Sequence, residues 1–221
     1  SQLYGITNAG FVPNGIDLDR FPEPHRKVPW QCVYASSPDR GLRILLGLWH
    51  HFIEVEPKAT LHICYGWETI DKYIAMGHGE LAQLKQDIQA HIDQPGIVYR
   101  GRLPQDDLAK LFADSYLWLY PTTFTEVSCI IAMEAMAGGC VPVTSAAGAL
   151  PETIDSAGLV VTGNAYTAAW KEYWFIIAKA ALLSPMIRKP LEKAGRERAK
   201  LLTWDASYEK WRELVVPMLE G

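Results

Sequence analysis

Two glutamates eight positions apart, Glu126 and Glu134, are the side chains whose spacing most directly suggests a binding site. The apolar run 116–120 predicts a buried strand just before Glu126, and Glu134 falls in an apolar helix that Gly138 and Gly139 are expected to end. Glu126 is therefore expected at the carboxyl end of a strand, where open α/β sheets bind ligands. A helix N-terminus can bind phosphate, and a carboxylate can accept hydrogen bonds from a vicinal diol. The pair favours sugar-nucleotide chemistry, although this spacing alone would more often reflect a helix cap and an exposed position.

The turn after the first predicted strand, 31–36, offers further phosphate ligands. Arg40 can donate two parallel hydrogen bonds to phosphate oxygens, and the hydroxyls of Ser36 and Ser37 can add donors. The turn precedes an amphipathic helix, Asp39–Val55, which Asp39 is expected to cap. The alternative is a solvated arginine in the first turn of that helix.

Other motifs occur in a fixed order along the chain. They are Asn14-Gly15-Ile16-Asp17 with Phe21, Ser36-Ser37-Pro38-Asp39-Arg40-Gly41, Gly101-Arg102-Leu103 and Gly148-Ala149-Leu150-Pro151-Glu152. Together with the E-x7-E spacing, they resemble the C-terminal, donor-nucleotide-binding domain of the retaining glycosyltransferases of family 4 (group 1). Those enzymes have the two-domain GT-B fold. The resemblance covers residues 8 to about 155, and the tail fits as closing helices.

The resemblance implies a role for each matching position. Glu126 would contact the donor sugar and Arg40 would stabilise the departing diphosphate, so these are the expected catalytic residues. Glu134 would bind the ribose hydroxyls. The ligand is a nucleoside diphosphate sugar, and neither a resident cofactor nor a metal is implied. The other donor-binding positions, which would contact the diphosphate or the base, are Ser36, Ser37, Gly101, Arg102, Leu103, Val127, Ser128 and Cys129.

Two departures from the family pattern bear on function. The family reads E-P-F-G where this chain has Glu126-Val127-Ser128-Cys129, which puts the Cys129 side chain where backbone usually approaches phosphate. The family's Gly-Arg and Lys-Gly are replaced by Ser36-Ser37 and Arg40-Gly41, so one cation of the usual pair remains. A non-catalytic sugar-nucleotide-binding or interaction module is therefore the alternative function. A sugar-nucleotide epimerase or a phosphorylase is a third interpretation.

The position of the Asn14-Gly15 motif predicts how much of the enzyme is present. In the family this motif follows the acceptor-binding domain, whereas only thirteen residues precede it here. We expect a single donor-binding domain over 1–221, with 1–30 leading in from a missing N-terminal acceptor domain and 165–221 forming closing helices. The acceptor, a glycan or a lipid, would bind that missing domain, and the isolated donor domain would be inactive.

Composition is that of an ordinary soluble globular protein. Hydrophobic residues make up 49% of the 221 residues and charged residues 21%, with a net charge of −4. This balance gives no reason to expect nucleic acid as a partner, and no apolar run reaches the length of a membrane span. The start lacks a signal-peptide pattern, so a cytoplasmic location is expected. The four cysteines are expected to be buried thiols, and the scattered histidines predict no metal site.

Apolar runs alternate with helical periods, which predicts an α/β, Rossmann-like, doubly wound parallel sheet of about six strands with helices on both faces. The tail beyond 165 is expected to be helical, with its tryptophans and tyrosines in the core or on a domain-facing surface. The expected strands lie near 31–36, 59–65, 96–100, 115–120, 140–144 and 158–161. The expected helices are 39–55, one or two within 68–93 with a break at 77–79, 106–113, 130–137, 167–183, 186–202 and one after 205.

The identity of the base is left open by the sequence. Arg102, Leu103 and the turn at Gly66-Trp67 are expected to border the base, and both uridine and guanosine donors fit such surroundings. Trp67 is expected to pack rather than to stack on the base. Residues 145–148 are expected to line the donor cleft.

Overall fold

A six-stranded, all-parallel sheet forms the centre of the molecule, with strand order β3-β2-β1-β4-β5-β6. The computed structural model describes residues 10–220, with side chains through 217, so the first nine residues of the predicted lead-in segment 1–30 lie outside it. The predicted α/β sheet is confirmed, and the strands lie within a few residues of the expected ranges. They are β1 (Gln31–Tyr34), β2 (Thr60–Ile63), β3 (Ile97–Tyr99), β4 (Leu117–Tyr120), β5 (Val141–Ser145) and β6 (Leu159–Val161).

The central strands are apolar on both faces because helices cover both. Every residue of β1 and β4 is buried, and Trp118 and Tyr120 of β4 stack with ring centroids 4.7 Å apart. The order of the strands reverses between β1 and β4, which pair directly. This pairing creates the topological switch point at which such sheets bind ligands beyond their carboxyl ends.

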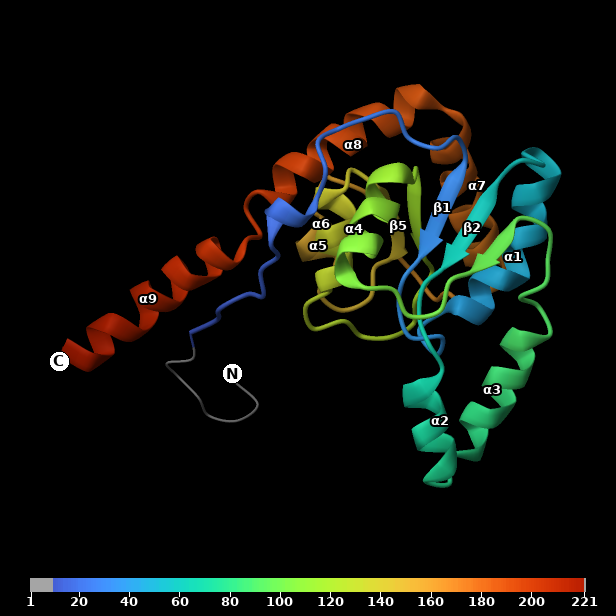
Figure 1. The fold of residues 1–221 in the computed structure, drawn as a ribbon, viewed down its shortest axis with the longest axis horizontal. Coiled ribbons are helices and arrows are strands. Elements are labelled where there is room, and N and C mark those ends of the chain that lie inside the picture. Colours follow the sequence, from blue (N-terminus) through green and yellow to red (C-terminus); the bar gives the residue numbers. More distant parts are fainter. Residues whose placement is uncertain (1–9, 221) are drawn as a thin grey trace.

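The helices form two layers, with α1 and α7 against one face and α4, α5, α6 and α8 against the other (Figure 1). In the first layer, Phe52 packs edge-to-face against Phe175 and Trp174. The helices are α1 (Leu42–Val55), α2 (Glu68–Ala75), α3 (Gly79–Gln89), α4 (Gln105–Asp114), α5 (Ile130–Ala137), α6 (Leu150–Ile154), α7 (Ala168–Leu183), α8 (Pro185–Ala199) and α9 (Trp204–Glu220).

The start of α1 differs from the expectation. Asp39 does not cap the helix, which begins at Leu42 after Gly41 in the left-handed region at φ 99°. An ideal Cβ on Gly41 would lie 2.3 Å from the carbonyl oxygen of Pro121, in the loop after β4. Glycine is therefore required both by backbone angle and by the close approach of this neighbouring loop.

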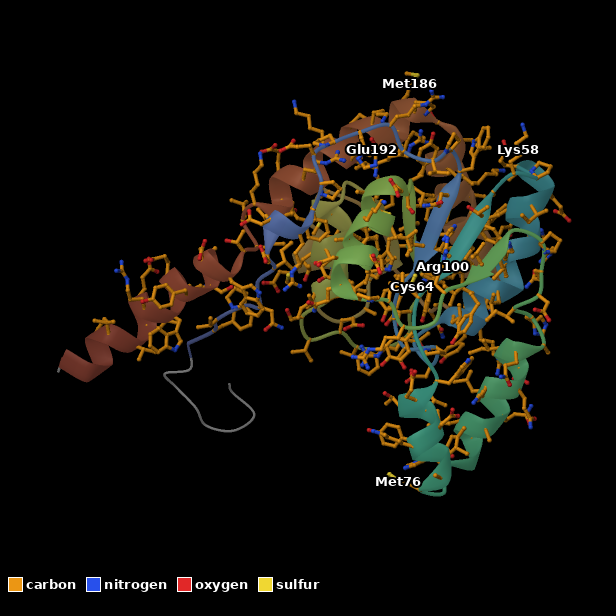
Figure 2. All side chains as sticks on the ribbon, viewed as in Figure 1. Lys58, Cys64, Met76, Arg100, Met186 and Glu192 are labelled. Atoms are coloured by element: carbon orange, nitrogen blue, oxygen red, sulfur yellow. The ribbon has the colours of Figure 1, made fainter. Side chains whose placement is uncertain are left out.

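The region between β2 and β3 forms two helices, α2 and α3, which project away from the sheet (Figure 1). The predicted break is confirmed, because Gly77 takes a left-handed conformation at φ 99° between them. Met76 marks the tip of this pair and is 74% exposed (Figure 2). The pair begins beside the carboxyl end of β2, which brings the first turn of α2 close to the ligand-binding edge of the sheet.

A buried lysine joins the ends of two helices on the second face. Lys27 is 6% exposed, and its Nζ donates hydrogen bonds to the carbonyl oxygens of Ala113 (2.9 Å), Ser115 (2.8 Å) and Gly138 (3.2 Å). These carbonyls lie at or just beyond the ends of α4 and α5, where helices leave acceptors unpaired. Burial lowers the pKa of Lys27 to about 8.

The helical tail is confirmed, and its aromatic residues divide into two groups. Trp170 and Trp174 of α7 are buried in the core, whereas Trp204, Tyr208 and Trp211 of α9 are about half exposed. In Figure 1, α9 extends away from the body of the domain. The buried Arg188 fixes the junction of α7 and α8 by donating to the carbonyls of Ala181 and Leu182 and by pairing with Glu192 at 3.2 Å.

Segments near the two ends of the described chain meet beside α8. Ile16 forms a parallel bridge with Thr203, and its N–H donates to the carbonyl of Leu202 at 2.9 Å. An ideal Cβ on Gly15 would lie 2.3 Å from the backbone nitrogen of Trp204. The Asn-Gly-Ile-Asp motif thus has a structural reason for its glycine, which is the contact with the start of α9.

Candidate functional site

A cleft of about 570 Å³ opens beyond the carboxyl ends of β1, β2 and β3. Cys64 and Arg100, labelled in Figure 2, mark the ends of β2 and β3 beside it. The start of α5 also lines the cleft, through Ile130 and Ile131. Six of the predicted site residues line this cleft and therefore come together. They are Ser36, Ser37, Arg40, Arg102, Leu103 and Glu134.

The turn after β1 is held by two hydrogen bonds to one backbone carbonyl. The carbonyl of Ser37 accepts hydrogen bonds from the hydroxyl of Tyr34 at 2.8 Å and from the N–H of Arg40 at 2.9 Å. These bonds curl the chain so that Ser36, Ser37 and Arg40 face the cleft. The turn can therefore present two hydroxyls and one guanidinium to the same ligand.

Arg40 lies between the cleft and the loop after β4. Its guanidinium carbon is 3.8 Å from the centroid of the Phe124 ring, and Nη1 is 3.4 Å from Oε1 of Glu126. Burial is the largest influence and lowers the pKa of Arg40, but Glu126, Tyr120 and Asp39 together raise it by more, so the net shift is upward. The buried Nε has no hydrogen-bond partner in the described part of the chain. Arg40 is thus a cation held in place by its neighbours, and its Nε–H is an unused hydrogen-bond donor among the described residues.

Glu126 is buried, being 7% exposed, and its side chain is directed into the protein. Oε1 accepts a 2.6 Å hydrogen bond from the hydroxyl of Tyr120, which in turn accepts one from Ser36 at 3.2 Å. Glu126 does not cap α5, whose N-cap is Cys129. Its Oε2 makes no hydrogen bond within residues 10–217. Glu126 therefore anchors the turn and leaves one oxygen free.

Residues 145–148 support Glu126 instead of lining the cleft, contrary to the expectation. The amide of Ala149 donates to the backbone carbonyl of Glu126 at 2.7 Å, and an ideal Cβ on Gly148 would lie 2.1 Å from that oxygen. The hydroxyl of Ser145 donates to the carbonyl of Thr122 in the same loop. The turn after β5 thus fixes the turn after β4.

Residues Val127, Ser128 and Cys129 lead into α5 outside the cleft's lining. Val127 is 83% exposed, and Cys129 is buried. The backbone N–H groups of all three donate no hydrogen bond within the described range. Burial raises the pKa of the Cys129 thiol to about 12, so it is an uncharged side chain at the helix N-terminus. These free amides remain available to an anion, which fits the predicted diphosphate position.

Glu134 faces the cleft from α5, just over one turn from the start of the helix at Ile130. Burial raises the pKa of its carboxyl, while the nearby Arg20 acts in the opposite direction. Arg20 itself donates a hydrogen bond to Oε1 of Gln105, another cleft residue. Within the described residues the Glu134 carboxylate has no ion-pair partner, so it is free to accept hydrogen bonds from a ligand.

The predicted base-contacting residues separate into two groups. Arg102 and Leu103 line the cleft, whereas Gly101, at φ 63°, forms the bend before them and lies outside its lining. Gly66 also lines the cleft. Trp67 packs against the core as expected, and the Nζ of Lys85 lies 5.3 Å from its ring centroid.

Several residues of the site were not anticipated from the sequence. Tyr120 is the last residue of a buried strand and Phe124 an aromatic in a loop, so no sequence signal distinguished them from packing residues. Glu68 at the start of α2 lines the cleft because α2 begins immediately after the Gly66-Trp67 turn. Away from the cleft, His50, His51 and Glu54 on α1 bring ligand atoms within 4.8 Å of one another and could hold a metal ion.

Comparison with known proteins gives a sequence match to one family. A model described as "Glycosyl transferases group 1" matches residues 53–173, more than half of the chain. Its match includes both glutamates of the E-x7-E spacing. No curated protein matches the chain significantly. Within residues 10–220, no helix combines the length and apolar character needed to cross a membrane.

Solved structures show the same fold at low sequence identity. Sucrose-phosphate synthase from Thermosynechococcus elongatus superposes with a TM-score of 0.73 at 18% identity, covering 95% of this chain and 52% of that one. HepE from Anabaena, in complex with UDP-glucose, gives 0.67 at 16% identity, with coverage of 95% and 57%. A mutant of TarM from S. aureus, in complex with UDP and other ligands, gives 0.70 at 14% identity, with coverage of 96% and 40%. The chain thus spans 40–57% of the length of these three proteins.

Proposed function

The chain belongs to the group 1 glycosyltransferases, and on that premise we propose that it is the donor-binding half of an enzyme that moves a sugar from a nucleoside diphosphate to an acceptor. The observation that carries the proposal is the convergence of Ser36, Ser37, Arg40 and Glu134 on one cleft at the switch point of the sheet. These residues supply hydroxyl and guanidinium donors for a diphosphate and a carboxylate for a ribose.

Transfer in this proposal proceeds with retention at the anomeric carbon. The bond between C1 and the diphosphate oxygen breaks, and its electron pair leaves with the diphosphate. The acceptor oxygen forms the new bond to C1 on the same face, and its proton passes to the departing phosphate oxygen. Arg40 and the free amides of 127–129 stabilise the growing negative charge. The free Oε2 of Glu126 orients the sugar, and no resident cofactor or metal takes part.

The whole enzyme in this proposal contains a second domain that binds the acceptor, a glycan or a lipid. Transfer then requires the two domains to close around the donor. The 221 residues alone are proposed to bind donor without transferring it at an appreciable rate, and the protein is proposed to act in the cytoplasm.

The test compares two neighbouring arginines. Arg40→Ala removes the guanidinium that lines the cleft, whereas Arg43→Ala removes one that is 67% exposed and pairs with Asp87 outside it. Calorimetric titration with UDP, GDP and ADP and their sugar conjugates should show binding by wild type and by Arg43→Ala, and weakened binding by Arg40→Ala. In the full-length enzyme, loss of one such contact should lower the rate about 10²–10³-fold. Unchanged turnover in Arg40→Ala would remove Arg40 from the mechanism.

A non-catalytic sugar-nucleotide-binding module is the second candidate, and one observation favours it. Tyr120 and Arg40 engage Oε1 of Glu126 within the protein, and the family's glycine at position 129 is a buried cysteine. A turn built in this way can bind a donor without supporting turnover. Tight donor binding by the full-length protein, combined with no transfer or hydrolysis of that donor, would favour this candidate over the first.

A further inference from the structure

Two charged side chains at the β2–β3 end of the cleft have no partner among the side chains that the structure describes. Glu68 and Arg102 both line the cleft and both are exposed. Among the residues whose side chains are described, neither takes part in a hydrogen bond or an ion pair. The Glu68 carboxylate is folded back over the cleft's backbone, since an ideal Cβ on Gly66 would lie 1.9 Å from its Oε2. An acceptor and a donor are therefore both available at this end.

The order of the strands determines which part of a nucleotide reaches these residues. The cleft crosses the sheet in the order β3, β2, β1, with neighbouring strands about 4.8 Å apart. With the diphosphate at the turn after β1 and the ribose at Glu134, the base extends toward β2 and β3. Glu68 follows β2 and Arg102 follows β3, so they lie roughly 5–10 Å along the sheet from the phosphate turn.

The bases differ in how well they match one carboxylate and one guanidinium. Guanine offers two adjacent donors, N1–H and the 2-amino group, and two acceptors, O6 and N7, which arginine commonly engages together. Uracil offers a single N–H flanked by two carbonyl oxygens, so a carboxylate that accepts from the N–H also faces an acceptor. Adenine presents an unprotonated ring nitrogen where guanine has N1–H. Guanine is the one of these three bases that satisfies both side chains fully.

We propose that the donor is a guanosine diphosphate sugar, with Glu68 accepting hydrogen bonds from N1–H and the 2-amino group and Arg102 donating to O6 and N7. This inference rests on the proposed function, because it assumes that the cleft binds a nucleoside diphosphate. It names Glu68 as a specificity-determining residue, and Glu68 lies in no motif recognised in the sequence. A misplaced base leaves Glu68 or Arg102 unpaired, and unpaired polar groups are the usual source of strong rejection.

The experiment titrates the whole chain with GDP, IDP, UDP and ADP by calorimetry. IDP keeps N1–H, O6 and N7 but lacks the 2-amino group, so the GDP-to-IDP ratio measures that group alone. GDP should bind about ten- to a hundred-fold more tightly than UDP or ADP, with IDP in between. Tighter binding of UDP or ADP than of GDP would overturn the inference and leave the proposed function intact. No binding of any of the four would overturn the proposed function itself.

Matched variants then assign the contacts. Glu68→Gln should weaken GDP binding about ten-fold or more and bring the GDP-to-IDP ratio toward one, because its amide cannot accept from both donors. Glu172→Gln makes the same change at an exposed position of α7 and should leave all affinities unchanged. Arg102→Gln should weaken GDP and IDP by the same factor, since O6 and N7 are common to both. A GDP-to-IDP ratio that is unaltered in Glu68→Gln would overturn the role of Glu68.

Discussion

The hydroxyl of Tyr120 donates a 2.6 Å hydrogen bond to Oε1 of Glu126, which joins the last residue of β4 to the turn that follows it. Because Ser36 donates to the same hydroxyl, the bond also links the turns after β1 and β4. These two strands are neighbours across the switch point of the sheet. One phenolic oxygen therefore holds together the turns that follow β1 and β4.

Tyr120→Phe should destabilise the domain by about 1–3 kcal/mol, because it leaves a buried carboxylate without its shortest hydrogen bond. Urea unfolding at neutral pH measures the change. Tyr73→Phe is the matched control, since Tyr73 is 46% exposed near the tip of α2 and should change stability by less than about 0.5 kcal/mol. Equal stability of the two variants would show that the Tyr120–Glu126 bond contributes little to folding.

Gly41→Ala should cost more than Gly77→Ala, although both glycines have φ 99°. Gly77 has open space around it, so its substitution should cost only the strain of the left-handed backbone, about 1–2 kcal/mol of unfolding free energy. At Gly41 the new methyl group also meets the carbonyl oxygen of Pro121. We expect a total cost above about 2 kcal/mol by chemical unfolding, together with weakened nucleotide binding because Arg40 would be displaced. A similar loss of stability in the two variants would mean that the loop after β4 moves aside easily to accommodate the new methyl group.

Glu134→Gln should stabilise the free protein while weakening nucleotide binding. Burial raises the pKa of Glu134, so the folded state favours the uncharged form and the ionised carboxylate costs stability at neutral pH. Stability should therefore rise in wild type as pH falls through this raised pKa, and the amide should remove that dependence. A gain in Tm of roughly 1–3 °C at pH 7 is expected by thermal shift.

The matched control for Glu134→Gln is Glu172→Gln, at an exposed position of α7, which should change neither Tm nor affinity. A variant of Glu134 with lower Tm and unchanged nucleotide affinity would indicate that the carboxylate stabilises the fold and does not bind the ribose.

Lys27→Met should destabilise the domain by roughly 2–4 kcal/mol at neutral pH, because it leaves the carbonyl oxygens of Ala113 and Ser115 without their donor and removes one of the two donors to Gly138. The pKa of Lys27 is lowered from 10.5 to about 8, so the charged form costs stability below pH 8 and this cost is relieved between about pH 8 and 10.5. The stability difference between wild type and variant should therefore widen as pH rises through this range.

Urea unfolding at pH 7, 8.5 and 10 measures the effect of Lys27. Lys58→Met, at an exposed position, should show no such pH dependence. A wild-type advantage that shrinks as pH rises would show that the three carbonyls stabilise the ammonium more than burial opposes it.

The strands and most helices could be predicted because each is marked by a local pattern of apolar residues or by a glycine that ends it. The start of α1 could not, because it depends on the approach of the Pro121 carbonyl to Gly41, a contact between residues far apart in sequence. The cradle around Lys27 likewise draws its carbonyls from residues 113, 115 and 138. Such contacts have no local signature.

Within the site, the residues that line the cleft could be predicted from the sequence better than the residues that position them. Ser36, Arg40 and Glu134 follow from motifs that place them at strand and helix ends. The contacts of Tyr120 and Phe124 depend on where one side chain points in a buried strand and another in a loop. Residues 145–148 were assigned to the cleft because their turn shares its edge of the sheet, yet Gly148 packs against the backbone of Glu126 and is not among the residues that line the cleft.

The bridge between Ile16 and Thr203 has a mechanical consequence. Because the two segments run parallel, tension applied at opposite ends of the chain loads their hydrogen bonds in shear, along the direction in which such bonds must break together. The hydrogen bonds of Ile16 to Leu202 and Trp204 therefore bear the applied force before the hydrogen bonds of the sheet do. Pulling the protein from its ends should break these two hydrogen bonds in a first small step, and only then load the strands of the sheet.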